Sequence, residues 1–358
     1  MIPALLPIAV VLAVVLLLWW QRRRRRDEAS AGSAGTDAGP PPPPTLARPA
    51  PPPLRPLLRR MYAAVMDTPA LAEESPCPDE AQAHVLAAAG DVLDRLDVRP
   101  QQMPRRPHLL PQLMRAVNDP NASGRDIAAI IARDPALAAN LLRIANSALY
   151  RPQGQPLENL ERAVVQVGTE GVRQIVATAL MQPVLDLDGY LFDRLPAAVW
   201  DFALRSAAAT AGYARRRRGD ALSAQLVGLL HGLGAVVAMR VLRDEYASRP
   251  GIEPDLGVAA ALVDRYTAVT ARTIAIGWKM PPALAAALDE QRPERDAVAP
   301  ATPLGTALRY GRMAAALAIL VRTGAETEEH ALAQLAALEP DTDANARLWK
   351  RLVAPNIE

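Results

Sequence analysis

The sequence predicts an all-helical protein. Half of its 358 residues are hydrophobic but only 4% are aromatic, so the core is expected to consist largely of Ala, Leu and Val side chains. Apolar residues recur three and four positions apart through most of the chain, and no segment shows the strict alternation that indicates a strand. The length is sufficient for one or two domains with a sizeable core. Together these observations predict closely packed helices.

The N-terminal residues 1–21 predict a single transmembrane helix. Residues 1–20 carry no charged side chain, end in Trp19 and Trp20, and are followed by Arg22 to Arg26. An apolar run of about 20 residues crosses a bilayer as a helix, and basic residues remain on the cytoplasmic side. A cleaved secretory signal would carry its basic residues before the apolar run. We therefore expect an uncleaved single-pass anchor with the rest of the chain in the cytoplasm.

Two segments connect this anchor to the main domain. Residues 22–56 begin with the five arginines that follow the predicted transmembrane helix and continue with a stretch rich in Ala, Gly and Pro. This composition predicts a disordered linker. Residues 57–101 predict a helical connector of two amphipathic helices. The first carries Arg55, Arg59 and Arg60 beside its apolar side chains, so two interpretations stay open: contact with an anionic membrane surface, or packing on the domain.

Three short helices are expected between residues 109 and 150. Ser123 and Asp126 form a capping-box pattern before the second of them. Asp134 is placed to cap the third, with Pro135 at the first helical position, where its missing amide hydrogen costs nothing. The helix-capping residues of this region therefore predict a compact cluster of short helices.

Longer helices follow in the second half of the chain. Gly168 is expected to end one helix and the next begins directly after it, while Pro196 opens another. The segment 221–242 is the most apolar and belongs at the centre of the fold, with its glycines allowing close helix contacts. Further helices are expected over residues 255–278, and three more between residues 303 and 353.

The run Arg215, Arg216, Arg217 and Arg218 ends one of these helices. The favoured interpretation is that cations are stabilised by the negative C-terminal end of a helix and are solvated there. The alternatives are a phosphate-binding patch, including one for nucleic acid, and a docking site for an acidic partner. Removing Arg22 to Arg26 lowers the formal net charge from +2 to −3, so the bulk of the chain is not a basic nucleic-acid binder.

Five motifs stand out in the main domain: LPQL at 110–113, NDPNAS at 118–123, ARDPALAANLLRIANSALY at 132–150, LERAVVQVGTEGVRQIV at 160–176 and LVGLLHGLG at 226–234. They resemble the HDOD (HD-related output domain) family of bacterial signalling proteins. The resemblance implies an HD-like helical bundle over residues 102–295, followed by C-terminal helices over 296–358. It also implies a bacterial source, which places the anchor in the inner membrane.

The resemblance also implies where a metal site would lie. Phosphohydrolases of the parent HD superfamily hold divalent metals with an adjacent His-Asp pair and further His and Asp ligands. Here His231 has the matching position, but Gly232 follows it in place of the aspartate. Phe202 stands where relatives often carry a histidine, and DEQRPE at 289–294 stands where they often carry a His-rich turn. We expect no metal, no cofactor and no catalytic residue, and interpret His231 as a core or pocket histidine.

Other residues at family-motif positions have ordinary structural explanations. Besides His231 and Gly232, these are Asp134, Pro135, Asn146 and Ser147. Asn146 and Ser147 lie at a helix end, where their usual role is capping and turn formation. The only cysteine is Cys77, so no intramolecular disulfide is expected, which is typical of a reducing compartment.

These observations favour a non-enzymatic signalling module tethered to the inner membrane, which acts by binding a protein or a nucleotide-like partner. The main alternative is a metal-dependent phosphohydrolase or cyclic-nucleotide phosphodiesterase with a divergent site. Nucleic-acid binding through the four arginines at 215–218 is a third, less favoured hypothesis.

Overall fold

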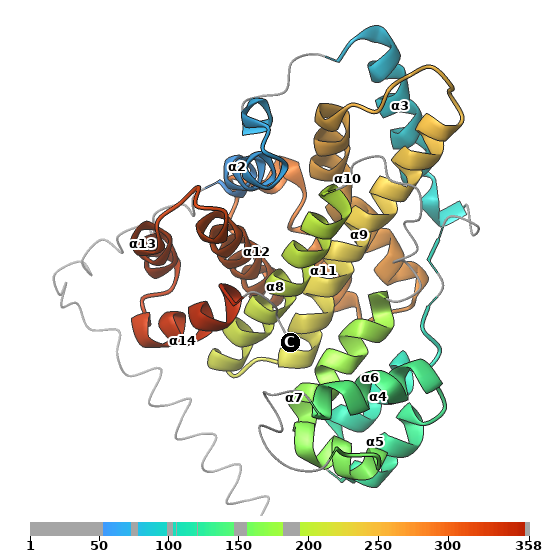
Figure 1. Ribbon diagram of the computed structural model, residues 1–358, viewed down its shortest axis with the longest axis vertical. Helices are drawn as coiled ribbons and strands as arrows, with labels where there is room; N and C mark the ends of the chain where they lie inside the picture. Colours follow the sequence, from blue (N-terminus) through green and yellow to red (C-terminus); the bar gives the residue numbers. More distant parts are fainter. Residues whose placement is uncertain are drawn as a thin grey trace, which may run out of the picture. The chain divides into compact units, whose positions relative to one another are not determined.

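The structure is a computed structural model that describes residues 53–72, 78–98, 103–104, 106–119, 121–146, 156–181 and 194–354 (Figure 1). In these residues the secondary structure is helical and contains no strand, which confirms the predicted all-α class. The described residues belong to one compact unit, which spans residues 50–358. The predicted anchor, the linker as far as residue 52, Cys77 and Ser147 lie outside the described residues.

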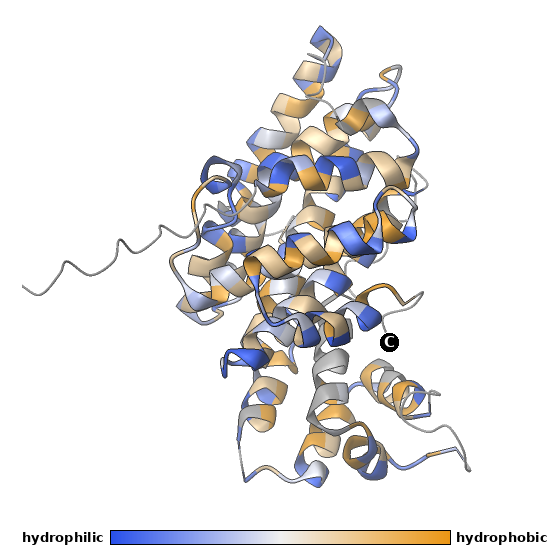
Figure 2. Cartoon of the chain, turned by 90° about the vertical axis from the view of Figure 1, so that its left-hand side faces the viewer, coloured by the Kyte–Doolittle hydropathy of each residue, from blue (hydrophilic) through white to orange (hydrophobic). Residues whose placement is uncertain are grey.

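The helices follow the expected order. They are α2 (Leu54–Met66), α3 (Glu80–Asp94), α4 (Leu110–Asn118), α5 (Gly124–Ile131), α6 (Pro135–Ala145), α7 (Leu160–Met181), α8 (Leu195–Arg216), α9 (Ala221–Ala247), α10 (Leu256–Gly277), α11 (Pro282–Asp289), α12 (Pro303–Arg322), α13 (Glu328–Leu338) and α14 (Thr342–Leu352). Short 3-10 turns are η1 (Pro69–Ala72), η2 (Leu96–Val98) and η4 (Pro293–Arg295). Polar and apolar residues are interspersed along individual helices, as expected for helices that bury one side (Figure 2).

The predicted helix ends are confirmed by their hydrogen bonds. The Ser123 side chain accepts from the backbone amide of Asp126, and the Asp126 carboxylate accepts from the amide of Ser123, which completes a capping box. Asp134 accepts from the amide of Leu137 at 3.2 Å and so caps α6. Gly168, at φ 63° and ψ −169°, interrupts α7 where the sequence predicted a helix end. Its positive φ is a conformation that glycine adopts without steric cost.

Helix α9 lies at the centre of the fold, as the sequence predicted. It packs against α8, α10, α3, α7, α11 and α12, and most of its side chains are buried on all sides (Figure 1). A Cβ atom at Gly228 would lie 2.6 Å from the Ala207 Cα of α8, and one at Gly234 would lie 2.3 Å from the Thr267 carbonyl oxygen of α10. These two glycines therefore permit the close packing of α8 and α10 on α9.

A second apolar cluster joins α2, α8, α12, α13 and α14. Among the described residues, α9 and α12 are the helices long and apolar enough to cross a membrane, but 94% and 83% of their apolar windows are buried in the protein. Burial of this kind identifies both as core helices. The three helices expected between residues 303 and 353 are confirmed as α12, α13 and α14.

Three of the four arginines that end α8, Arg215, Arg217 and Arg218, are exposed, whereas Arg216 is half-buried, and two of the four make specific contacts. The Arg216 guanidinium lies over the rings of Tyr213 and Tyr310, at 5.7 and 5.3 Å from their centroids, and donates to the side-chain oxygen of Asn345. Arg217 forms an ion pair of 2.7 Å with Glu339. These arginines attach α8 to the C-terminal helices, whose position the sequence could not reveal.

Candidate ligand-binding pocket

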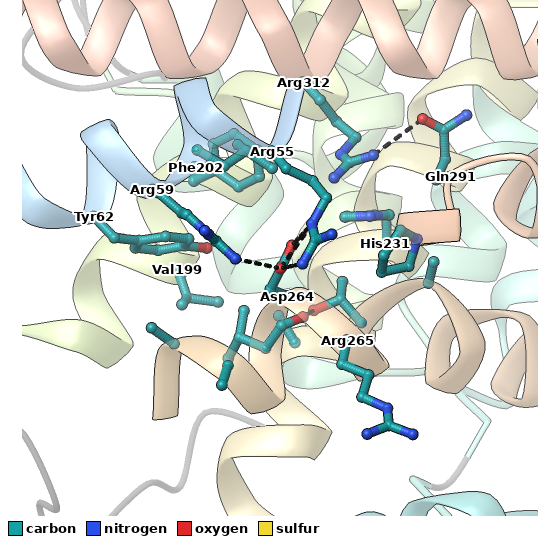
Figure 3. A pocket seen from close by; sticks show the side chains of 18 of the residues that line it. Arg55, Arg59, Tyr62, Val199, Phe202, His231, Asp264, Arg265, Gln291 and Arg312 are labelled. Carbon is teal, nitrogen blue, oxygen red and sulfur yellow. Dashed lines mark hydrogen bonds and ion pairs between the residues drawn. The ribbon is translucent and has the colours of Figure 1, made fainter. Parts of the chain in front are cut away.

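A cavity of about 510 Å³ lies where α2, α8, α9, α10 and α12 meet (Figure 3). Its lining includes Arg55, Leu58, Arg59 and Tyr62 of α2, Val199 and Phe202 of α8, His231, Gly232 and Ala235 of α9, Val263, Asp264, Arg265 and Thr267 of α10, Gln291 and Glu294 after α11, and Arg312 of α12. Four arginines and two carboxylates line it, so its formal charge is positive. The cavity combines this positive charge with an apolar wall.

His231 is a neutral imidazole in the floor of this cavity. Its side chain projects from the buried central helix α9, the residue is only 4% exposed, and the ring nitrogen Nε2 has no hydrogen-bond partner. Burial, reinforced by the positive charge of Arg312, holds the pKa of His231 well below its ordinary value of 6.5. A neutral imidazole can donate a hydrogen bond from one ring nitrogen and accept one at the other.

Arg312 brings a buried cation to the same cavity. Its Nη1 donates to the side-chain oxygen of Gln291 at 3.1 Å, while its Nε has no partner. Gln291 is held in turn by its amide nitrogen, which donates to the carbonyl oxygen of Gly305 at 3.1 Å. Burial lowers the pKa of Arg312 to about 10, a value at which it still carries its charge at neutral pH. The Gln291 contact fixes the guanidinium within the lining of the cavity.

Asp264 of α10 ties helix α2 to the rim of the cavity. The Arg55 Nε lies 2.9 and 3.2 Å from the two carboxylate oxygens, and the Arg59 guanidinium lies 3.8 Å from one of them (Figure 3). At the start of α2, the backbone amides of Leu54 and Arg55 donate to the Asp296 carboxylate at 3.1 and 3.0 Å. Since its apolar side is buried as well, α2 packs on the domain, one of the two interpretations left open above.

The side chains around His231 do not fit a divalent metal. In the part of the chain that the structure describes, no three His, Cys, Asp or Glu residues come together in a group that could hold a metal ion. The positive charge of Arg312 acts on His231, and Asp264, a carboxylate of the lining, is already paired with two arginines. A buried guanidinium next to the imidazole repels a second cation.

Four positions singled out by the family resemblance converge on this cavity. Phe202, His231, Gly232 and Gln291 come from distant parts of the sequence and all line it. The remaining family-motif residues lie elsewhere. Asp134 and Pro135 begin α6, and the Asn146 amide exchanges two hydrogen bonds with the backbone of Leu157, at 2.9 and 2.7 Å. This exchange joins the end of α6 to a residue eleven positions later, so the structural role of Asn146 is to hold these two segments together.

Arg59, Asp264 and Arg312 line the pocket, but the sequence did not identify them as site residues, and the basic residues of α2 were not expected in a site. A signal for Arg312 existed, because an arginine within the apolar run YGRMAAALAIL of α12 must be buried or disrupt the helix packing. Asp264 carried no comparable signal. Its partner Arg55 lies 209 residues away, a pairing that local patterns do not reveal.

Comparison with known proteins identifies the family to which this helical domain belongs. The chain matches the HDOD domain over residues 103–293. It is 31% identical over 160 residues to an uncharacterized protein of Treponema pallidum (strain Nichols), a match that covers 44% of this chain but only 29% of the Treponema protein. The chain therefore spans less than a third of the length of that relative.

Two solved structures share the fold. A protein of Shewanella amazonensis SB2B, named as a candidate metal-dependent phosphohydrolase, is 20% identical with a TM-score of 0.50, covering 75% of this chain and 98% of that one. An HDOD domain protein of unknown function from Geobacter sulfurreducens is 17% identical with a TM-score of 0.50, covering 76% and 95%. These identities show a common fold. With more than half of its length matched, the chain belongs to the HDOD domain family.

Proposed function

We propose that this chain is a non-enzymatic signal-transduction module of the HDOD family, tethered to the inner membrane of a bacterium, and that it acts by binding a partner. The observation that carries the proposal is the buried Arg312 guanidinium beside the neutral His231, where a metal-dependent enzyme would need anionic ligands. Hydrolysis of a phosphate ester at an HD site depends on a metal-activated water. A cavity with a positive lining is instead suited to binding.

The competing function is a metal-dependent phosphohydrolase or cyclic-nucleotide phosphodiesterase with a divergent site. It is favoured by the Shewanella structure, whose name includes this activity although its 20% identity extends to the fold alone. In that case a divalent metal would have to bind beside His231 with ligands that the HD pattern does not include.

The two functions are distinguished by metal content and hydrolysis. The purified full chain is incubated with Mn²⁺ or Mg²⁺, desalted, measured by elemental analysis and assayed with bis(p-nitrophenyl) phosphate. We expect less than stoichiometric metal and background hydrolysis, unchanged in His231→Ala. His330→Ala is the control, because His330 is exposed and bonded to Glu326. Stoichiometric metal with hydrolysis that is lost in His231→Ala but kept in His330→Ala would establish the enzyme instead.

The tether is tested separately. The full chain and a chain lacking residues 1–26 are expressed in a bacterium, and membranes are washed with alkaline carbonate, which removes peripheral proteins. The apolar run of residues 1–20 predicts that the full chain stays in the washed membranes and that the truncated chain is soluble. Recovery of the full chain in the soluble fraction would refute the tether without affecting the binding function.

A further inference from the structure

Resting on the proposed function, we propose that the cavity around His231 binds a phosphate ester with an apolar or aromatic part, the chemical class of a nucleotide. The phosphate group lies between the guanidinium groups of α2 and the guanidinium of Arg312. This assigns a ligand class to the cavity and a role to α2, which precedes the residues that match the family.

Charge is the first argument for an anionic group. Leaving aside Arg265, whose guanidinium turns away, the arginines lining the cavity are Arg55 and Arg59 of α2 and Arg312 of α12, and these three outnumber its two carboxylates. Guanidinium groups form paired hydrogen bonds with the oxygens of phosphates and carboxylates, which makes arginine the usual residue for recognising them. The arginines already present in the cavity would therefore stabilise a bound anion by electrostatic attraction.

Unpaired donors are the second argument. His231 and Arg312 are at least nine-tenths buried and line the cavity, and each has a ring or guanidinium nitrogen without a hydrogen-bond partner. A buried polar atom that lacks a partner destabilises the folded state. Oxygens of a bound phosphate supply acceptors for the Arg312 guanidinium, and His231 in its neutral form can donate to another oxygen.

Asp264 indicates where the anion would bind. Its carboxylate already holds Arg55 closely, whereas Arg59 is 3.8 Å away, beyond ordinary hydrogen-bonding distance. Arg59 therefore has donors left for a ligand, and Figure 3 shows it on the same side of the cavity as Asp264. A phosphate, with three terminal oxygens, contacts Arg59 and Arg312 while Asp264 keeps Arg55 in place.

The apolar wall and the volume argue for an organic ester over inorganic phosphate. Leu58, Leu86, Val199 and Phe202 line the cavity together with the Tyr62 ring. At about 510 Å³ the cavity falls within the size range of small-molecule sites, roughly 300–1,000 Å³. A phosphate ion alone would leave this wall without contacts, whereas an attached base or other flat apolar group covers it.

The test uses the purified full chain and isothermal titration with AMP, GMP, CMP and UMP, the matching nucleosides, and inorganic phosphate. We expect at least one nucleotide to bind at least about tenfold more tightly than its nucleoside and than inorganic phosphate. Arg312→Met and Arg59→Met should each weaken that binding about tenfold or more. Arg265→Met is the matched control, because its guanidinium lies over the Tyr266 ring and turns away from the cavity centre in Figure 3.

Three results would overturn the inference. The first is that no nucleotide binds, and the second is that Arg265→Met weakens binding as much as Arg312→Met does. The third is a nucleoside that binds as tightly as its nucleotide, since the phosphate would then contribute nothing. Circular dichroism spectra and unfolding midpoints are recorded for each variant, and Arg59, on the accessible side of α2, gives a readout if Arg312→Met fails to fold. The metal and hydrolysis assay addresses the proposed function independently, so failure of one is distinguishable from failure of the other.

Discussion

Replacing Arg312 by methionine is expected to stabilise the protein while it removes the cation from the cavity. Arg312 is buried in α12, its guanidinium has one hydrogen bond, to Gln291, and no carboxylate of the described residues lies within 4.0 Å of it. A buried charge without a close partner destabilises the native state, and well-packed apolar replacements of such groups are often neutral or stabilising. Methionine keeps an unbranched apolar side chain in the same space.

The expected size follows from the pKa of Arg312, which burial lowers from its ordinary value to about 10. Each pKa unit corresponds to about 1.4 kcal/mol, so holding the charge costs the native state about 3 kcal/mol. The folded-state pKa is the lower one, so this cost is complete below about pH 10 and disappears only as the pH rises through the ordinary pKa of an arginine. The lost hydrogen bond to Gln291 costs about 1 kcal/mol. Arg312→Met should therefore gain about 2 kcal/mol at neutral pH.

Urea unfolding of the full chain at pH 7, followed by circular dichroism, measures this change in the free energy of unfolding. Arg309→Met is the matched comparison, since Arg309 lies one turn earlier on α12 and is also buried, but pairs with Asp296 at 3.5 Å and donates to its carbonyl oxygen at 2.6 Å. Removing a paired buried arginine should destabilise the protein by about 3 kcal/mol or more. If Arg312→Met is destabilised as much as Arg309→Met, Arg312 has a structural role and the reasoning fails.

Three further predictions concern α2, helix packing and pH. Asp264→Asn removes the partner of Arg55 and should speed amide hydrogen exchange in α2, corresponding to a loss of about 1 kcal/mol from this partly exposed pair; unchanged exchange would show that Asp264 does not hold α2. Gly234→Ala should lower the free energy of unfolding by about 2 kcal/mol, because its Cβ would meet the backbone of α10 at 2.3 Å, whereas Gly277→Ala meets only the flexible end of Met103 and should change it little. Burial keeps the His231 pKa below 6.5, so the free energy of unfolding should fall by up to about 1.4 kcal/mol for each unit by which the pH drops below about 6.5. If His231 causes this fall, the free energy of unfolding of His231→Gln should depend less on pH in the same range.

The helices and their ends could be predicted because they depend on neighbouring residues. The Ser123 capping box, the interruption at Gly168 and the buried centre at α9 follow from spacing, cap chemistry and composition, and each agrees with the structure. The family resemblance also indicated Phe202, His231 and the segment 289–294 as positions of a possible metal site. In the structure Phe202, His231 and Gln291 of that segment line one cavity.

The polar half of the cavity could not be predicted in the same way. Periodicity shows which side of a helix is buried, but it does not show which helices face each other. Arg55 and Asp264 are 209 residues apart, and their contact depends on how α2 lies across α10. For the same reason the sequence could not reveal that Arg216 and Arg217 attach to residues at the C-terminal end of the chain.

The buried arginines of the bundle provide a comparison that separates structural from functional cations. Arg205 pairs with Asp201 at 2.8 Å and donates to the Ala354 carbonyl oxygen, and Arg309 is held by Asp296. Arg216 also has unpaired nitrogens, but its guanidinium lies over two tyrosine rings, which stabilise a cation. Within the described residues Arg312 has neither a close carboxylate nor an aromatic ring, and it alone of these four lines the cavity. Asp264 and Asp296 act on Arg312 only from beyond ion-pair distance, so the anion that we propose would supply the close counter-ion that this buried guanidinium lacks.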